Sequence, residues 1–312
     1  MRGKPTLFVL LLLLASPWYL AASTAVAQTN SAKTAATGID ATVSVDTKIS
    51  DDLKPTLTWA INPGPPFHII SGPLQGEGFC DGLVDSLAIL LPNYQHKKVV
   101  VPQGRVLDLL SAPDSQMCFP CMIKRQDPPK GVRYTESTHQ FPRHVLITRA
   151  SLLQPTGPLE LSELLATNKY RYGYPQGRRY GVLDPLLEAY KTEHPDLVLA
   201  RSGPGEADSV LSLIEIGRID FTVDYPMVLK YHKLVSQKGA LVPLKMHQIL
   251  ENQQNPPRHA VGCADNTWGA KVVANINQQI PALQKSAKFI QVKQFWLDEA
   301  PAKQPETGSK VP

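Results

Sequence analysis

The sequence predicts an α/β protein made of two similar units, each a mostly parallel sheet flanked by helices. Over residues 57–123, apolar strand-like runs alternate with amphipathic helices in the order β-α-β-α-β. Residues 170–223 repeat that order. Residues 241–300 supply only one strand and two helices, too little for a third domain. The alternation favours parallel strands joined by right-handed crossovers, and the last segment must pack back onto one of the two units.

The first unit is organised around residues 57–91. Its opening strand, 57–61, stops at a proline-stiffened loop that carries Phe67. The next segment, 81–91, has helical apolar spacing, with Asp81 as the expected N-cap and Pro92 as its end. Ligands in open α/β sheets bind outside the carboxyl ends of the strands, so we expect a site at this edge. The other elements expected in this unit are strands at 97–101 and 117–123, a helix at 105–112 and an apolar strand at 141–148.

The second unit begins with a short helix at 161–165 and a strand at 170–174. A loop with Gly177 follows, and Asp184 with Pro185 is expected to cap and open the next helix. The remaining expected elements are strands at 197–200, 219–223 and 259–263, helices at 186–191, 206–216 and 226–235, a helix after Trp268-Gly269 and a last helix after Pro281.

The two ends of the chain predict export. Residues 1–27 have the basic start, apolar core and small-residue cleavage site of a secretory signal peptide, so we expect a periplasmic protein. The apolar run is too short to span a bilayer, although an uncleaved anchor is the alternative. Residues 28–53 are expected to be a disordered linker and residues 301–312 a disordered tail.

Composition argues against several kinds of function. The formal net charge is +5, and loss of the signal leaves about +3, which is too mild for nucleic-acid binding. The chain has neither Gly-x-Ser-x-Gly nor His-Glu-x-x-His, the motifs of two hydrolase classes. We expect a non-catalytic protein without a cofactor or a metal, and a monomer. His68, His139 and His144 are each expected to be a surface or satisfied side chain and not a ligand.

Several segments resemble family 3 extracellular solute-binding proteins, and an exported branch of that family in particular. They are residues 57–79 with Pro65-Pro66-Phe67, residues 217–224, Trp268-Gly269 with Ile276-Asn277, and Trp296-Leu297-Asp298. The order and spacing of these segments carry the resemblance, which covers roughly residues 53–300.

The resemblance implies a type II periplasmic binding fold, a two-lobed clamp. Lobe 1 would be residues 54–145 completed by 241–300, and lobe 2 would be residues 146–240, with hinges near 141–149 and 239–244. A small polar solute, anionic or zwitterionic, would be caught in the cleft between the lobes. Delivery to a membrane transporter is the leading context, and presentation to a membrane sensor comes next. A dehydratase-like enzyme on the same clamp is the rival from another class.

The resemblance and the residues together suggest a set of ligand-binding side chains. In the family, the position of Phe67 lines the ligand; the alternative for Phe67 is a buried core aromatic. The family aspartate that matches Asp224 receives a ligand ammonium; the alternative for Asp224 is a turn residue. The family's carboxylate-gripping arginine has no counterpart, because Asp127-Pro128 stands there. This argues against a free α-amino acid unless a neighbour substitutes. The expected ligand-binding residues are Phe67, Lys124, Arg125, Gly177, Arg178, Tyr180 and Asp224.

The four cysteines allow three disulfide pairings in an oxidising compartment. Cys118 and Cys121 form a Cys-x-x-Cys run that ends a strand, whereas a thioredoxin-like pair begins a helix, and a zinc site needs further ligands. In the strand order of the related proteins, Cys263 lies on a strand beside this run. The resemblance therefore implies a disulfide from Cys118 or Cys121 to Cys263, with buried free thiols as the alternative.

Overall fold

The structure is a computed structural model that describes residues 54–203, 205–236, 242–254 and 256–297. The expected signal peptide (1–27), linker (28–53) and tail (301–312) lie outside the described residues, as does part of the second expected hinge. Among the helices in the described ranges, none has the length and apolar character needed to cross a membrane.

The first lobe is built on a six-stranded sheet in which β2, β1, β3, β11 and β4 follow one another and β5 also pairs with β11. The first three strands are parallel to each other, and β11 runs antiparallel to β3, β4 and β5. This matches the expected mostly parallel order. The strands are β1 (Thr56–Ile61), β2 (Gln95–Val100), β3 (Met117–Ile123), β4 (Val132–Tyr134), β5 (His139–Gln140) and β11 (Arg258–Ala264).

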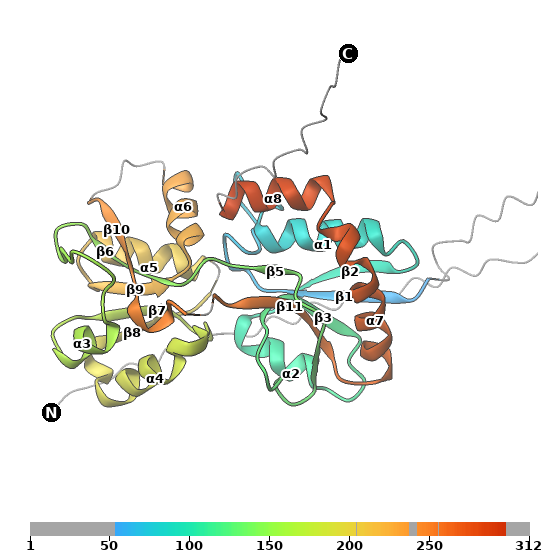
Figure 1. Cartoon of the computed structure of the whole chain (residues 1–312), viewed down its shortest axis with the longest axis horizontal. Coiled ribbons are helices and arrows are strands. Elements are labelled where there is room, and N and C mark those ends of the chain that lie inside the picture. Colours follow the sequence, from blue (N-terminus) through green and yellow to red (C-terminus); the bar gives the residue numbers. More distant parts are fainter. Residues whose placement is uncertain (1–53, 204, 237–241, 255, 298–312) are drawn as a thin grey trace, which may run out of the picture. The chain divides into compact units, whose positions relative to one another are not determined.

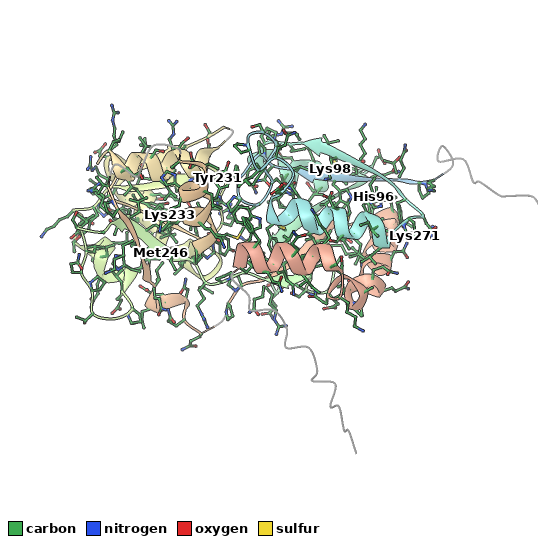
Figure 2. The ribbon with its side chains drawn as sticks, turned by 90° about the horizontal axis from the view of Figure 1, so that it is seen from above. His96, Lys98, Tyr231, Lys233, Met246 and Lys271 are labelled. Carbon is green, nitrogen blue, oxygen red and sulfur yellow. A yellow bond between two sulfur atoms is a disulfide. The ribbon has the colours of Figure 1, made fainter. Side chains whose placement is uncertain are left out.

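Helices cover both faces of this sheet (Figure 1). Three of them, α1, α7 and α8, pack on one face, and α8 lies alongside α1 in both views (Figures 1 and 2). The short α2 covers the other face, where Val106 and Leu110 pack against Phe119. Burial of these apolar stripes stabilises the lobe. The helices are α1 (Phe79–Leu90), α2 (Val106–Leu110), α7 (Thr267–Leu283) and α8 (Ala287–Leu297).

The second lobe has a five-stranded sheet in the order β10-β6-β9-β7-β8. Strands β7, β8 and β9 are parallel, whereas β6 runs antiparallel to its two neighbours. Figure 1 shows α5 and α6 on one face and α3 and α4 on the other. The elements are β6 (Val145–Arg149), β7 (Tyr172–Pro175), β8 (Val198–Arg201), β9 (Phe221–Asp224), β10 (Leu244–Gln248), α3 (Leu161–Ala166), α4 (Asp184–Glu193), α5 (Glu206–Glu215) and α6 (Pro226–Val235).

The chain returns to the first lobe later than the sequence suggested. Strand β10 pairs with β6 in the second sheet, and Glu251 accepts hydrogen bonds from the backbone N–H groups of Leu161 and Ser162. Residues 244–252 therefore belong to the second lobe, and the crossing lies between Asn252 and β11. The first crossing runs from β5 to β6, over residues 141–144, because the expected strand at 141–148 begins only at Val145.

Three local expectations also differ from the structure. Asp81 is the third residue of α1, not its N-cap, although its carboxylate accepts the N–H of Gly78 at 3.2 Å. Asp184 lies inside α4, whose N-cap is Leu183. Pro281 does not separate two helices, since it lies in the last turn of α7.

Two disulfides join the four cysteines. Cys118 and Cys263 link the adjacent strands β3 and β11, which confirms the expected bond to Cys263. Cys80 and Cys121 link α1 to β3, a pairing that the sequence left open.

Candidate functional site

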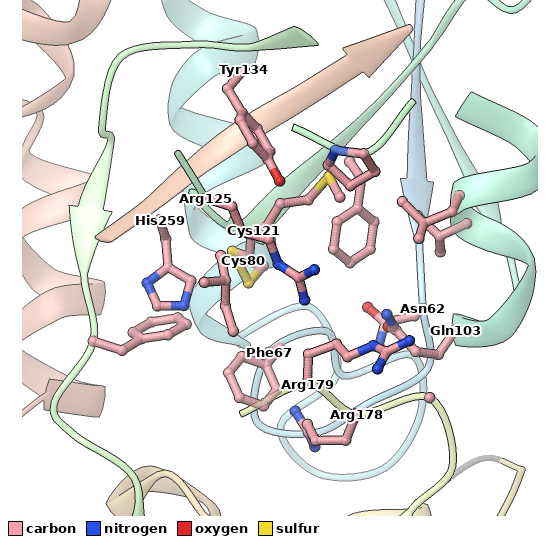
Figure 3. Close-up of a pocket in the computed structure, with 18 of the residues that line it drawn as sticks. Asn62, Phe67, Cys80, Gln103, Cys121, Arg125, Tyr134, Arg178, Arg179 and His259 are labelled. Carbon is pink, nitrogen blue, oxygen red and sulfur yellow. A yellow bond between two sulfur atoms is a disulfide. The ribbon is translucent and has the colours of Figure 1, made fainter. Parts of the chain in front are cut away.

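A cavity of about 350 Å³ lies between the carboxyl ends of the first-lobe strands and the loop after β7 of the second lobe (Figure 3). Its volume suits a small solute. The first lobe contributes side chains that follow β1, β2 and β3, and the second contributes the Gly177–Arg179 loop. Lining residues include Asn62, Phe67, Gln103, Cys121, Arg125, Asp127, Tyr134, Phe141, Gly177, Arg178, Arg179, Tyr225 and His259.

Phe67 is held in place by its own backbone. Its N–H donates to the carbonyl of Gly64 at 2.9 Å, and its carbonyl accepts the N–H of Cys80 at 2.8 Å. A Cβ at position 78 would lie 2.4 Å from the Phe67 oxygen, so only glycine allows this close approach. The loop is thereby fixed against the start of α1. The ring of Phe67 packs against the rings of Phe141 and Tyr225, at centroid distances of 5.5 and 5.8 Å.

A carboxylate inside the first lobe ties down the rest of this loop. Asp81 accepts the N–H of Ile69 at 2.9 Å, and its other oxygen lies 2.7 Å from Nδ1 of His68. Burial acts to raise the pKa of Asp81, but the bonds from His68 and Ile69 outweigh it and leave the pKa below its usual value. Asp81 is therefore a structural anion that positions the loop of Phe67.

Three guanidinium groups face the cavity. Arg178 comes from the second lobe, and its Cζ lies 4.8 Å from the centroid of the Phe67 ring in the first lobe. Arg125 follows β3, and its Nη2 lies 3.4 Å from Oδ2 of Asp184 across the lobes. Arg179 is half exposed. Among the described residues that line the cavity, Asp127 is the only carboxylate, so the lining itself is electropositive. Three carboxylates outside the lining each lie near one of these arginines: Asp184 near Arg125, Asp224 near Arg178, and Glu188 near Arg179 at 3.7 Å.

Asp224 lies behind Arg178 and is not among the lining residues. The residue is 1 % exposed, and its carboxylate lies 3.5 Å from Nη2 of Arg178 and accepts the N–H of Tyr225 at 2.8 Å. Burial raises the pKa of Asp224, while Arg178 and the Tyr225 N–H act in the opposite direction. In this arrangement the carboxylate contacts a protein cation rather than the cavity.

The structure brings only some of the expected site residues together. Phe67, Arg125, Gly177 and Arg178 line the cavity. Two others do not, because the Tyr180 side chain is buried in the second-lobe core and Lys124 pairs with Glu136 at 3.1 Å. The backbone N–H of Tyr180 donates to Oδ1 of Asp184 at 2.7 Å, so this residue orients the partner of Arg125.

A cluster of histidine and aromatic rings forms the wall of the cavity nearest the two segments in which the chain crosses between the lobes. Nε2 of His259 and the hydroxyl of Tyr225 are 3.0 Å apart, and the ring of His139 stacks on that of His259 at 5.1 Å. Burial lowers the pKa of His259 to about 3 and lowers the pKa values of His139 and His144 well below the usual range. All three imidazoles are therefore neutral near pH 7, and they add no positive charge to the site.

Some lining residues were missed by the sequence analysis. Asn62 directly follows β1 and Gln103 follows β2, so the rule about carboxyl ends of strands could have found both. Tyr134 gave no such signal, because β4 was not expected. Within the described ranges, no group of three or more His, Cys, Asp or Glu side chains could hold a metal ion.

Comparisons with known proteins identify the fold. The chain matches no protein-family model and no curated protein. Among solved structures, it is similar to one from work on glutathione import through GshT and the cystine ABC importer TcyBC of Streptococcus mutans. That match has a TM-score of 0.57 and 13 % identity over 79 % of this chain and 96 % of the other.

Two further structures are similar to the same extent. A putative L-cystine ABC transporter protein of Listeria monocytogenes has a TM-score of 0.58 and 15 % identity, over 78 % of this chain and 96 % of the other. A histidine kinase sensor domain that resembles periplasmic binding proteins has a TM-score of 0.58 and 15 % identity, over 79 % and 97 %. The chain thus has the two-lobed α/β fold of periplasmic binding proteins.

Proposed function

We propose that this chain is an exported solute-binding protein of the family 3 type, which captures a small anionic solute between its lobes. The observation that carries the proposal is the placement of Arg125 and Arg178 on opposite lobes around one cavity of about 350 Å³. A ligand stabilises a closed clamp only when both lobes contact it, because it must bind the closed state more tightly than the open one.

The charge of the cavity favours an acid. Among the lining residues that the structure describes, Arg125, Arg178 and Arg179 outnumber the one carboxylate, Asp127. A guanidinium binds a carboxylate through two parallel N–H donors, a geometry that a neutral solute does not use fully. Asp224 is engaged by Arg178, so a ligand ammonium would have only Asp127 as a lining carboxylate. A solute with a net negative charge, such as a small dicarboxylate, therefore fits better than a simple α-amino acid.

The aromatic rings give the site its second recognition element. Phe67, Phe119, Phe141 and Tyr225 form apolar walls, which favour a solute whose charged groups are separated by a short carbon skeleton. Burial raises the pKa of the Tyr225 hydroxyl, so this group stays neutral and can take part in hydrogen bonds. The walls and the arginines together define an amphipathic cavity.

The leading partner is a membrane transporter. The neighbour from Streptococcus mutans is described in connection with an ABC importer, and that from Listeria monocytogenes as a putative ABC transporter. Both descriptions support delivery of the solute to such a transporter. A sensor role is the second candidate, and its support is the likeness to the histidine kinase sensor domain. An enzyme on the same clamp would alter the solute chemically, which neither binding role does.

Ligand extraction tests this proposal. Purified protein is incubated with a metabolite pool, washed and denatured, and the released compounds are identified by mass spectrometry. We expect a small acid that is unchanged by the protein. Release of a chemically altered product would favour the enzyme, and a neutral or cationic ligand would contradict the electropositive site.

A further inference from the structure

The two disulfides of this protein have different surroundings. Cys118 and Cys263 are both fully buried between β3 and β11, and neither lines the cavity. Cys80 and Cys121 both line it, and Cys121 is only partly buried. Figure 3 shows their sulfur–sulfur bond among the lining side chains, near Arg125 and Phe67. One disulfide thus lines the cavity through a partly buried cysteine, and the other is fully buried and serves as an internal control.

The cavity also suits the chemistry of thiol–disulfide exchange. The attacking species is a thiolate, which must reach one sulfur atom of the bond. Arg125 follows Cys121 by four residues, and Arg178 lines the same cavity from the second lobe. Positive charge near a thiol lowers its pKa and raises the thiolate fraction. The same arginines would concentrate a thiol that carries a carboxylate, so this step rests on the proposed anion-binding function.

The surroundings of Cys80 favour its sulfur atom as the leaving group. Cys80 is the second residue of α1, a 12-residue helix, where the helix dipole favours negative charge. The neighbouring carboxylate, Asp81, accepts hydrogen bonds from the N–H groups of Ile69 and Gly78. Cys80 is fully buried, whereas Cys121 is partly exposed. Attack should therefore occur at Cys121, with Cys80 as the leaving group.

We propose that a small thiol bearing a carboxylate exchanges with the Cys80–Cys121 disulfide and forms a mixed disulfide with Cys121 inside the cavity. The thiolate sulfur forms a bond to Sγ of Cys121 as the bond to Sγ of Cys80 breaks. The electron pair of that bond leaves on Cys80, which then takes up the proton lost by the incoming thiol. No other oxidant or reductant is needed, because one disulfide replaces another.

The test compares two thiols on the purified full chain. Protein is mixed with 3-mercaptopropionate or with the neutral 2-mercaptoethanol at equal thiolate concentrations, quenched with iodoacetamide and mapped by peptide mass spectrometry. We expect the mercaptopropionate adduct on Cys121, an alkylated Cys80 and an intact Cys118–Cys263 bond. The carboxylate thiol should react about tenfold faster or more. Arg125→Gln should reduce the ratio of the two rates. Arg218→Gln should leave it unchanged, because Arg218 is exposed and precedes β9, at the opposite end of that strand from Asp224.

The same experiment can overturn the proposal. Equal rates for the two thiols, an adduct on Cys80, no adduct at all, or equal modification of Cys118 and Cys263 would each contradict it. Calorimetric titration with succinate distinguishes failure of the thiol–disulfide exchange from failure of the proposed binding function. A protein that binds succinate but leaves Cys121 unmodified would lack the exchange and keep the binding role. Preferential modification of Cys121 in a protein that retains no acid on extraction would support the exchange and contradict the binding role.

Discussion

Asp224 supports Arg178 from behind the cavity, with 3.5 Å between Oδ2 of the carboxylate and Nη2 of the guanidinium. Both residues belong to the second lobe, and the guanidinium reaches the ring of Phe67 in the first. Asp224, at the end of β9, thus holds the guanidinium of Arg178 where it contacts the first lobe. This relationship changes what a mutation at Asp224 should do.

Replacing Asp224 by alanine should affect both binding and stability. Because Asp224 is buried and its loss deprives Arg178 of a charged partner, we expect the free energy of unfolding to fall by about 1–3 kcal/mol. Ligand affinity should fall as well, since Arg178 is no longer held in position. Chemical denaturation and calorimetric titration measure the two effects.

Asp127→Asn provides the matched control. Asp127 is an exposed carboxylate that lines the cavity directly. Its neutralisation should leave the unfolding midpoint unchanged and should strengthen the binding of an acidic ligand, because a like charge is removed. An unchanged stability for Asp224→Ala, together with a loss of affinity for Asp127→Asn, would reverse the roles that we assign to the two carboxylates.

Much of the fold could be predicted from sequence, because its strands and helices carry clear apolar periods. The strand at 117–123 and the helix at 226–235 have the predicted bounds. Strand β10 was missed since Leu244–Gln248 is mostly exposed or half-buried and lacks an apolar pattern. Without it, the return of the chain to the first lobe was placed too early. Sheet pairing, and not local propensity, decides that boundary.

The candidate site was predictable in outline but not in detail. The rule about strand ends predicted a site at the edge of the first sheet, where Phe67 lies. It could not show that Asp224 would meet Arg178, because the two residues are brought together only by the packing of β7 and β9. The same limit applied to Cys80 and Cys121, whose pairing depends on how α1 lies against β3.

Phe67→Leu should separate the aromatic contribution from simple packing. Leucine keeps most of the apolar volume, so we expect a loss of stability of only about 1–2 kcal/mol. The contact between the ring and Arg178 disappears, and ligand affinity should fall by about threefold to tenfold, equivalent to roughly 0.5–1.5 kcal/mol. Calorimetric titration and thermal unfolding are the measurements. Unchanged affinity with a large drop in melting temperature would identify Phe67 as a packing residue only.

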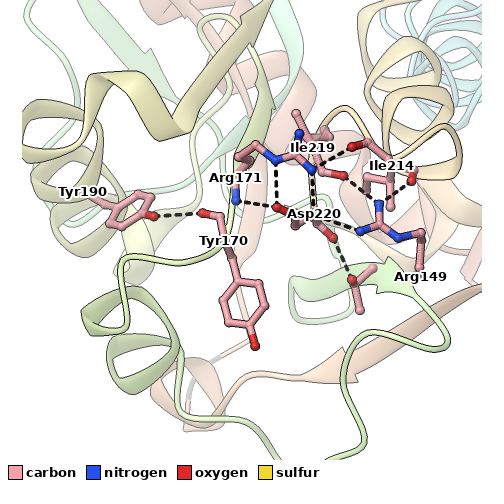
Figure 4. A network of polar contacts seen from close by, with 9 residues as sticks. Arg149, Tyr170, Arg171, Tyr190, Ile214, Ile219 and Asp220 are labelled. Carbon is pink, nitrogen blue, oxygen red and sulfur yellow. Dashed lines mark hydrogen bonds and ion pairs between the residues drawn. The ribbon is translucent and has the colours of Figure 1, made fainter.

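The second lobe contains an ion-pair network that predicts acid sensitivity (Figure 4). The Asp220 carboxylate accepts hydrogen bonds from Arg149 at 2.9 Å and from Arg171 at 3.0 Å. Burial acts to raise the pKa of Asp220, but the bonds from Arg171 and Arg149 outweigh it and hold the pKa below its usual value. The ionised form is therefore favoured in the folded state.

This lowered pKa fixes the sign of the pH dependence. The stabilisation from Asp220 is fully present above the pKa of the unfolded chain and is lost as the pH falls through the lower folded pKa. Asp220→Asn should therefore reduce stability at pH 7, by about 1–3 kcal/mol, and should flatten the decline of stability below pH 4. Denaturation curves at several pH values across this range test the prediction. If the stability of the variant declined below pH 4 as steeply as that of the wild type, the role of Asp220 would be contradicted.

Arg125 and Asp184 should contribute to closure of the clamp. Their atoms are 3.4 Å apart across the lobes, but the Arg125 side chain is partly exposed, so the pair is screened by salt. Arg125→Gln should weaken ligand binding more at low ionic strength than at high ionic strength. Titrations at two salt concentrations measure the difference. Equal weakening at both would show that Arg125 does not act through charge.

The most direct test of an electropositive binding cavity is calorimetric titration of the extracted ligand into the wild type, Arg178→Gln and Arg218→Gln. Arg218 is an exposed residue before β9, at the opposite end of the strand from Asp224, so its variant controls for the loss of one positive charge. We predict that the ligand is an acid, that Arg178→Gln binds it about tenfold to hundredfold more weakly, and that Arg218→Gln binds it as the wild type does. An Arg178→Gln variant that folds normally and binds as tightly as the wild type would contradict the account.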